Sequence, residues 1–334
     1  MRLPIIMLQL NMGFFNYFSK VNRLKRKEAK LQKKQSKLLP KPKAGKALKV
    51  GLALGGGGML GFGHVGAIMA FRDSGIEFDY VAGTSVGAVI GALYCNDVSN
   101  EIMEQAAESF KIKDILTTKI PLMPSKTEKL EALITKYAGD INIEQLKKPL
   151  TIVAVDIISG QEVRLTQGSL AKAVAGSCAF PGLFNPVEFN GMHLMDGSLQ
   201  NTIPSDAARR MGADIVIAVD LNSNRGYGTT STKYIEVIKV SLRILMKASA
   251  LKGYVESDLC ITPDLTGFKH TKLKGSKDMI EIGYKAAIAA VPEICKLLRR
   301  VAPDPDALLI SRKIKQFDEA GKEAIENINT EEDY

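Results

Sequence analysis

The chain has 334 residues, enough for one large α/β domain or two smaller ones, and 46% of them are hydrophobic, enough for a substantial core. It contains no Trp and only 6% aromatic residues, which argues against a carbohydrate cleft and against a base-stacking nucleic-acid surface. The net charge of +9 is uneven: residues 1–49 hold 14 Lys and Arg against the single acid Glu28, and the remainder is slightly acidic.

The N-terminal 46 residues form a distinct tail in which an apolar stretch precedes a basic run. Residues 3–18 are apolar but are interrupted by polar residues, too short for a spanning helix and followed by no signal-peptidase site. Two interpretations stay open, a disordered tail and an interfacial anchor in which the apolar stretch and the basic run act together on an anionic membrane face. We therefore expect an anionic membrane surface, and no nucleic acid, as partner of residues 1–46.

Cysteine and histidine spacing gives no sign of a metal site. The four cysteines lie far apart without a CxxC pair, and the three histidines form no HExxH cluster. We expect free, reduced thiols and no metal or organic cofactor. This predicts a cytoplasmic protein, peripheral on the inner face of the membrane if the tail binds there.

Strand and helix patterns alternate from residue 49 onward, as is typical of a parallel α/β sheet. A buried strand at 49–54, a glycine loop and a helix are followed by a short strand at 78–83 and a helix at 85–94. Residues 100–147 show only helical periodicity. Further strands are expected at 151–158, 161–166 and 214–221, a type I′ hairpin at Asn190-Gly191, and helices at 232–250 and 277–299.

These elements predict one α/β domain with a mostly parallel central sheet sandwiched between helices in three layers. We place the domain at residues 47–317, between the basic N-terminal tail (1–46) and a polar C-terminal tail (318–334).

The segment GTSVG, residues 83–87, lies between a predicted strand and a predicted helix. This G-x-S-x-G context is the one a nucleophile elbow requires, with Ser85 on a sharp turn and Gly83 and Gly87 leaving room for it. Ser85 would then start a helix, whose dipole favours developing negative charge. The alternative is a plain turn, since the pattern alone is common.

The glycine run Gly55–Gly58 follows the first strand and admits three interpretations. A P-loop is unsupported because Gly-Lys-Ser/Thr is missing. A dinucleotide fingerprint fits Gly56, Gly58 and Gly61, with Glu77 or Asp79 about twenty residues on, but the carboxylate does not close the second strand. An oxyanion hole facing Ser85 is favoured by the nearby GTSVG.

A nucleophilic serine needs a base, and Asp196 in MDGSLQN follows a predicted strand directly. A strand end in a parallel α/β sheet is where active sites form, although Asp-Gly can also be a simple turn. The three histidines fit the role less well: His270 lies in a polar loop, His193 lies within a short strand, and His64 is expected to pack or cap on the helix after the glycine loop.

The chain resembles the patatin-like phospholipase family over about residues 49–290. The resemblance rests on four blocks in the family's order: LALGGGGMLGFGHVGAI, GTSVGAVIGALY, SCAFPGLFNPVEFNGMHLMDGSLQNTIP, and ADIVIAVDL with ITPDLTGF. It implies a Ser–Asp dyad without histidine, with Ser85 as nucleophile and Asp196, followed by Gly197, as base. It also implies oxyanion donors at Gly56, Gly57 and Gly58, and a phospholipid or other acyl-lipid substrate.

Two positions depart from the family's pattern. Leu60 stands where the family often has Arg or Lys, and Ser198 stands where the aspartate block usually has Gly or Ala. Three other functions remain open. The acyl-enzyme could pass its acyl group to an alcohol as a transacylase, the glycines could bind a dinucleotide, or the chain could be a non-catalytic membrane-binding or partner-binding module. We also expect the helical region 100–147 to shape an acyl channel.

Overall fold

The computed structural model describes residues 23, 26, 48–110, 114–116, 124–223, 233–268, 275–298, 308–309 and 312. The chain divides into two compact units, Gly45–Ala290 and the two ends Met1–Ala44 with Val291–Tyr334. The architecture below concerns the first unit. Apart from residues 23 and 26, the predicted N-terminal tail lies outside the described residues, as do His270 and the predicted C-terminal tail.

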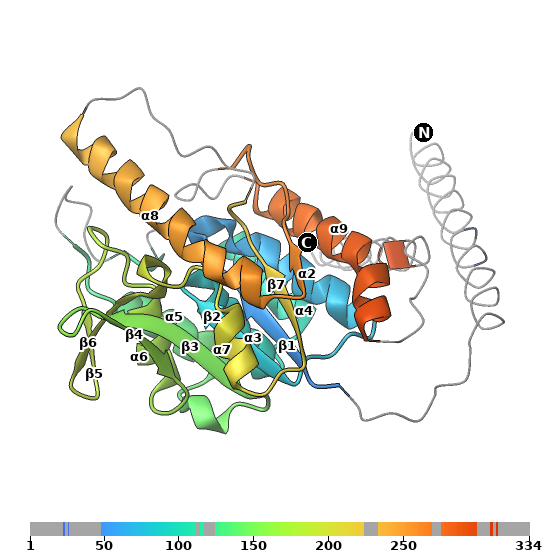
Figure 1. The fold of residues 1–334 in the computed structure, drawn as a ribbon, viewed down its shortest axis with the longest axis horizontal. Coiled ribbons are helices and arrows are strands. Elements are labelled where there is room, and N and C mark those ends of the chain that lie inside the picture. Colours follow the sequence, from blue (N-terminus) through green and yellow to red (C-terminus); the bar gives the residue numbers. More distant parts are fainter. Residues whose placement is uncertain are drawn as a thin grey trace, which may run out of the picture. The chain divides into compact units, whose positions relative to one another are not determined.

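A single mixed sheet of eight strands forms the centre of this unit (Figure 1). The strands pair in the order β5-β6-β3-β2-β1-β7-β8, and β4 pairs with β3. The neighbours among β1, β2, β3, β7 and β8 are parallel, and β4, β5 and β6 join in antiparallel pairs. The strands are β1 (Val50–Leu54), β2 (Tyr80–Thr84), β3 (Leu150–Asp156), β4 (Gln161–Leu165), β5 (Val187–Phe189), β6 (Met192–Asp196), β7 (Ile215–Val219) and β8 (Leu259–Ile261).

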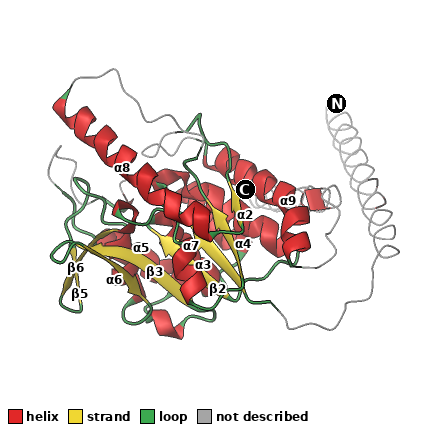
Figure 2. Ribbon diagram, in the orientation of Figure 1, coloured by secondary structure: helices red, strands yellow, loops and turns green. Residues whose placement is uncertain are grey.

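Helices cover both faces of the sheet, which confirms the predicted three layers (Figure 2). Ala53, Ala82 and Val153 point from neighbouring strands into a core formed with α7 and Ala250 of α8. On the opposite face, Gly91 lets α3 approach the strands closely. The helices are η1 (Gly58–Gly61), α2 (Phe62–Asp73), α3 (Val86–Cys95), α4 (Asn100–Ser109), α5 (Glu128–Ala138), η3 (Ile143–Gln145), α6 (Leu170–Ser177), η4 (Gly197–Leu199), α7 (Ser205–Arg210), α8 (Tyr234–Glu256) and α9 (Ser276–Leu297).

Strand β3 brings two strand ends together. Its residues 152–156 pair with β4 along one edge, so its other edge is shared by β2 and β6. On that edge β2 ends at Thr84, opposite Val153, and β6 arrives from the other direction and ends at Asp196, opposite Ala154. The carboxyl ends of β2 and β6 therefore meet head to head.

Most elements expected from the sequence are present. Asn190 and Gly191 both have positive φ, 50° and 80°, as a type I′ turn between β5 and β6 requires. The region 100–147 contains α4, α5 and η3 among its described residues, and no named strand there, with isolated bridges at Ser125 and Asn142. Strand β8 and helices α6 and α7 were not predicted. No helix among the described residues combines the length and apolarity needed to span a bilayer.

Candidate active site

Ser85 occupies the sharp turn between β2 and α3. Its φ of 54° and ψ of −126° are rare for a residue with a side chain, and such strain persists only where the surroundings enforce it. Ser85 is also the N-cap residue of α3, at the positive end of the helix dipole. The turn thus holds a hydroxyl where negative charge is favoured.

The two glycines beside Ser85 are needed for close backbone packing. A Cβ at Gly87 would lie 2.0 Å from the carbonyl oxygen of Leu54, at the end of β1. A Cβ at Gly83 would lie 2.5 Å from the carbonyl oxygen of Gly87. These distances are far below van der Waals contact, so the turn can form only because both positions lack a side chain.

Asp196 lies directly against the serine. The Ser85 hydroxyl donates a hydrogen bond of 2.8 Å to Oδ2 of Asp196, while the amide of Ser198 donates to Oδ1 at 2.9 Å. Asp196 is 2% exposed, and burial raises the pKa of its carboxyl although both hydrogen bonds oppose this. The carboxylate is therefore a stronger base than one in water, and its Oδ2 faces the Ser85 hydroxyl.

Gly197 allows the turn after Asp196 to cross β3. A Cβ there would lie 2.3 Å from the carbonyl oxygen of Val153, so η4 can rest on the strand only with glycine at this position. Ser177, which no sequence pattern predicted, supports the other turn, the one at Ser85. Its buried hydroxyl accepts from the amide of Ser85 at 2.8 Å and donates to the Val153 carbonyl at 2.6 Å.

The glycine loop lies beside the dyad, but its three predicted donors are not equivalent. The amide of Gly56 donates to the carbonyl of Thr202 at 2.9 Å, so the assignment of this N–H as an oxyanion donor is not supported. Gly56 has a steric role instead, because a Cβ there would lie 2.3 Å from Oγ of Ser198 and 3.5 Å from Cβ of Ser85. Gly58 is the first residue of η1, and its φ of 56° favours glycine. Gly57 is the N-cap residue of the same short helix.

His64 packs behind this loop, as predicted. It is fully buried, and its Nε2 lies 2.7 Å from the carbonyl oxygen of Gly55. Burial lowers the pKa of His64 to about 4, so the ring is neutral at pH 7, and Nε2 must carry the proton because a carbonyl can only accept. His64 fixes the loop and does not reach Ser85. Leu60, where the family often has a cation, is fully buried in the core.

The position of Asp79 does not support a dinucleotide site at the glycine loop. Asp79 lies before β2, at the opposite end of that strand from the glycine loop, where it accepts from Lys49 at 2.7 Å and from the amide of Val50 at 2.8 Å. His193 lies on β6, with Nε2 3.8 Å from a carboxylate oxygen of Glu188. Among the described residues, no three His, Cys, Asp or Glu side chains come together as metal ligands.

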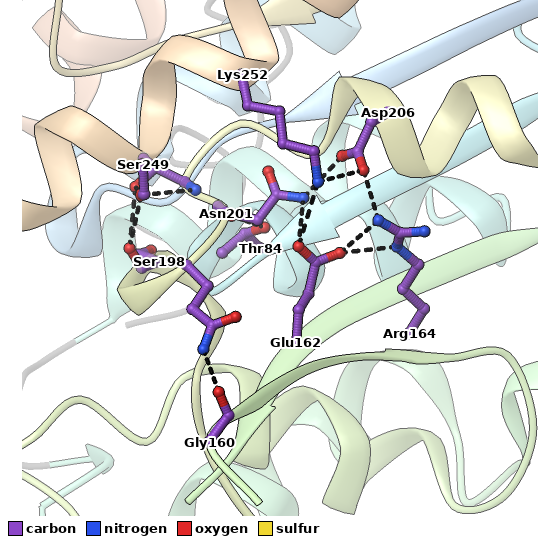
Figure 3. A network of polar contacts seen from close by, with 11 residues as sticks. Thr84, Gly160, Glu162, Arg164, Ser198, Asn201, Asp206, Ser249 and Lys252 are labelled. Carbon is purple, nitrogen blue, oxygen red and sulfur yellow. Dashed lines mark hydrogen bonds and ion pairs between the residues drawn. The ribbon is translucent and has the colours of Figure 1, made fainter.

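A polar network extends from the turn that follows Asp196 (Figure 3). The Thr84 hydroxyl, one residue before Ser85, donates to the carbonyl of Asn201 at 2.9 Å, and the Asn201 amide donates to Asp206 at 2.8 Å. The Asp206 carboxylate also forms ion pairs with Arg164 at 2.5 Å and with Lys252 at 2.6 Å. The network ties β2, β4, α7 and α8 to the dyad. It was not predicted, because its members are scattered polar residues with no local motif.

Sequence comparison identifies similar proteins. Residues 52–209 match the family model described as patatin-like phospholipase. An uncharacterized NTE family protein of Mycobacterium tuberculosis is 34% identical over 180 residues, 53% of this chain and 50% of that protein. Human patatin-like phospholipase domain-containing protein 6 is 34% identical over 183 residues, 52% of this chain and 13% of that protein. The chain thus spans half the length of the mycobacterial relative and far less of the human one.

Among solved structures, VipD from Legionella pneumophila is similar to this chain. The alignment has a TM-score of 0.47 and 14% sequence identity, and it covers 86% of this chain and 78% of that chain.

Proposed function

The chain belongs to the patatin-like phospholipase family, and on that premise we propose that it hydrolyses carboxylic esters of phospholipids or other acyl lipids. The observation that carries the proposal is the 2.8 Å hydrogen bond from the Ser85 hydroxyl to the buried Asp196 carboxylate. The backbone of Ser85 is strained, with a positive φ. A nucleophile and a base within hydrogen-bonding reach are the signature of covalent acyl transfer.

In the proposed first step, Asp196 takes the Ser85 proton while the serine oxygen attacks the ester carbonyl carbon. The oxyanion of the tetrahedral intermediate is stabilised by the start of α3 and by the amides of Gly57 and Gly58. This assignment follows from the position of the loop, since Gly56 adjoins Ser85. The intermediate collapses to an acyl-enzyme, and the departing alkoxide receives the proton from Asp196.

In the second step, water attacks the acyl carbonyl of the acyl-enzyme and gives its proton to Asp196. The fatty acid leaves as the proton returns to Ser85, and both catalytic groups are restored. The dyad suffices for each proton transfer, so the proposal requires no histidine, metal or organic cofactor.

Hydrolysis of a medium-chain nitrophenyl ester, followed by mixed phospholipids, tests the function. Wild type should turn over, whereas Ser85→Ala and Asp196→Asn should each lose about 10²–10⁴-fold or more in kcat while remaining folded. Added alcohol acceptors would separate a hydrolase from a transacylase by product. Equal rates for wild type and both variants would contradict the proposal.

We further propose that residues 1–46 bring the enzyme to the anionic, cytoplasmic face of a membrane. The support is compositional, an apolar stretch followed by a basic run. Deleting residues 1–46 should weaken binding to anionic vesicles, most at low salt, and leave turnover of a soluble ester unchanged. Equal vesicle binding by the shortened chain would contradict the role of the tail.

A further inference from the structure

Helix α8 is longer than the sheet it crosses. It runs for 23 residues, about 35 Å, whereas the neighbouring β7 has five residues and spans about 17 Å. Its second half, from Met246 to Glu256, is tied to the sheet layer by hydrogen bonds and an ion pair. In Figure 1 the first half of α8 extends beyond the strands.

One side of α8 is an exposed apolar surface. Of the eleven large apolar side chains that are strongly exposed among the described residues, seven lie on this helix. With 3.6 residues per turn, all seven fall within an arc of about 140° around the helix axis and so share one side of the helix. We call them the α8 apolar stripe: Tyr234, Val237, Ile238, Ile244, Leu245, Leu251 and Val255, each between 40% and 82% exposed.

The opposite side of α8 is attached to the turn that carries the dyad aspartate. The Thr202 hydroxyl donates to the Met246 carbonyl at 2.8 Å, and the Ser249 hydroxyl donates to the Ser198 carbonyl at 2.9 Å. Ser198 in turn donates its amide to Asp196. A surface that binds the stripe is therefore held one helix diameter, about 10 Å, from the turn after Asp196.

The charges beside the stripe favour an anionic surface as its occupant. From residue 233 to 256, the charged side chains described as exposed are Lys233, Lys247 and Lys252, the last paired with Asp206, whereas Glu236, Arg243 and Glu256 are half-buried. An apolar helix face bordered by lysines matches a helix lying in the headgroup region, with its apolar side chains among acyl chains and its lysines at phosphates.

We propose that the α8 apolar stripe docks the enzyme on an anionic lipid bilayer and presents the dyad end of the sheet to it. This inference rests on the proposed lipid substrate, which resides in that bilayer. It adds a folded docking surface that is separate in sequence from residues 1–46.

Vesicle sedimentation with the full chain tests the stripe. All proteins carry Ser85→Ala, so the lipid stays intact, and the vesicles contain phosphatidylcholine with or without phosphatidylglycerol. Ile244→Asp with Leu245→Asp should lower partitioning onto anionic vesicles about tenfold or more, because two apolar anchors are lost. The matched control is Ile102→Asp on α4, where Ile102 is as exposed as Val237, at 44%. It should bind like the parent.

Other results would overturn the docking proposal. Unchanged partitioning of the double variant, or an equal loss in the Ile102 control, would remove the stripe's role in binding. A double variant that keeps vesicle binding but changes from dimer to monomer in light scattering would make the stripe a surface for a second copy. Soluble-ester turnover by chains with Ser85 intact judges the proposed chemistry independently, so failure of the stripe and failure of the dyad are distinguishable.

Discussion

Asp196 combines two properties that oppose each other in a folded protein. Its carboxylate is almost fully buried, which makes the charged form costly, yet the proposed chemistry needs that charged form next to Ser85. Hydrogen bonds from the Ser85 hydroxyl and the Ser198 amide offset part of this cost. The basicity that the proposed chemistry requires of this residue therefore lowers the stability of the fold.

The pH dependence of catalysis should report Asp196. Because burial raises the pKa of this carboxyl, the acidic limb of kcat/KM should lie at a pH above the ordinary aspartate value of 3.8. Activity should fall as the pH drops through that raised pKa, because the protonated acid cannot accept the serine proton. A pH series with a soluble ester measures the limb, and a limb at or below 3.8 would contradict the account.

The same burial predicts that Asp196→Asn is more stable than wild type. A raised pKa in the folded state means that stability from this group is present at low pH and is lost as the pH rises through the folded pKa. The amide can still accept from Ser198 and can donate to Ser85. Urea unfolding at pH 7 should show a gain of about 1 kcal/mol that shrinks at acidic pH. A loss of stability at pH 7 would show that the charge is not a source of strain.

At the level of elements, the close approach of helix and strand backbones holds Ser85 and Asp196 in place. Helix α3 begins where Gly87 touches the end of β1, and η4 crosses β3 at Gly197. These contacts involve carbonyl oxygens of strands, which cannot move aside as a flexible side chain could. The elbow is thus fixed by the sheet itself.

Gly87→Ala should cost about 3 kcal/mol or more in the free energy of unfolding, because its Cβ would meet the Leu54 carbonyl at 2.0 Å. Gly267→Ala is the matched control, since no atom lies within 4 Å of a Cβ at that position and no positive φ is required. It should change stability by less than about 0.5 kcal/mol. Similar denaturation midpoints for the two variants would refute the close-packing explanation.

The network around Asp206 links four elements, and its removal should be costly. Burial tends to raise the pKa of Asp206, but hydrogen bonds from Lys252 and Asn201 outweigh it and lower that pKa. Asp206→Ala removes the carboxylate that accepts from the Asn201 amide. The free energy of unfolding should fall by about 2–3 kcal/mol at pH 7. The stability that Asp206 contributes at neutral pH should disappear as the pH falls through its lowered pKa.

Glu128→Ala is the control for that network. Its ion pair with Lys126, at 3.5 Å, lies between side chains that are each more than 60% exposed, so its loss should cost less than about 0.5 kcal/mol. Urea titrations of both variants compare the two. Equal costs would mean that Asp206 behaves as a surface charge.

At the scale of the whole molecule, periodicity and turn chemistry predicted the sheet and its sandwiching helices. They could not predict that Ser85 and Asp196, 111 positions apart, lie in contact. That contact depends on β6 sharing an edge of β3 with β2, which is a choice of strand partner and leaves no local signal. Strand β8 was not predicted because it has three residues and, unlike the equally short β5, no hairpin turn beside it. The hydrogen bond of the Gly56 amide could not be predicted because its partner, the Thr202 carbonyl, is distant in sequence.

The most direct test of the dyad is labelling with a fluorophosphonate, which reacts covalently with activated serines. Intact mass and peptide mapping should show one adduct per wild-type chain, on Ser85, with none in Ser85→Ala and labelling at least about 100-fold slower in Asp196→Asn. An adduct on another residue, or equally fast labelling of Ser85 without the aspartate, would contradict the Ser85–Asp196 assignment.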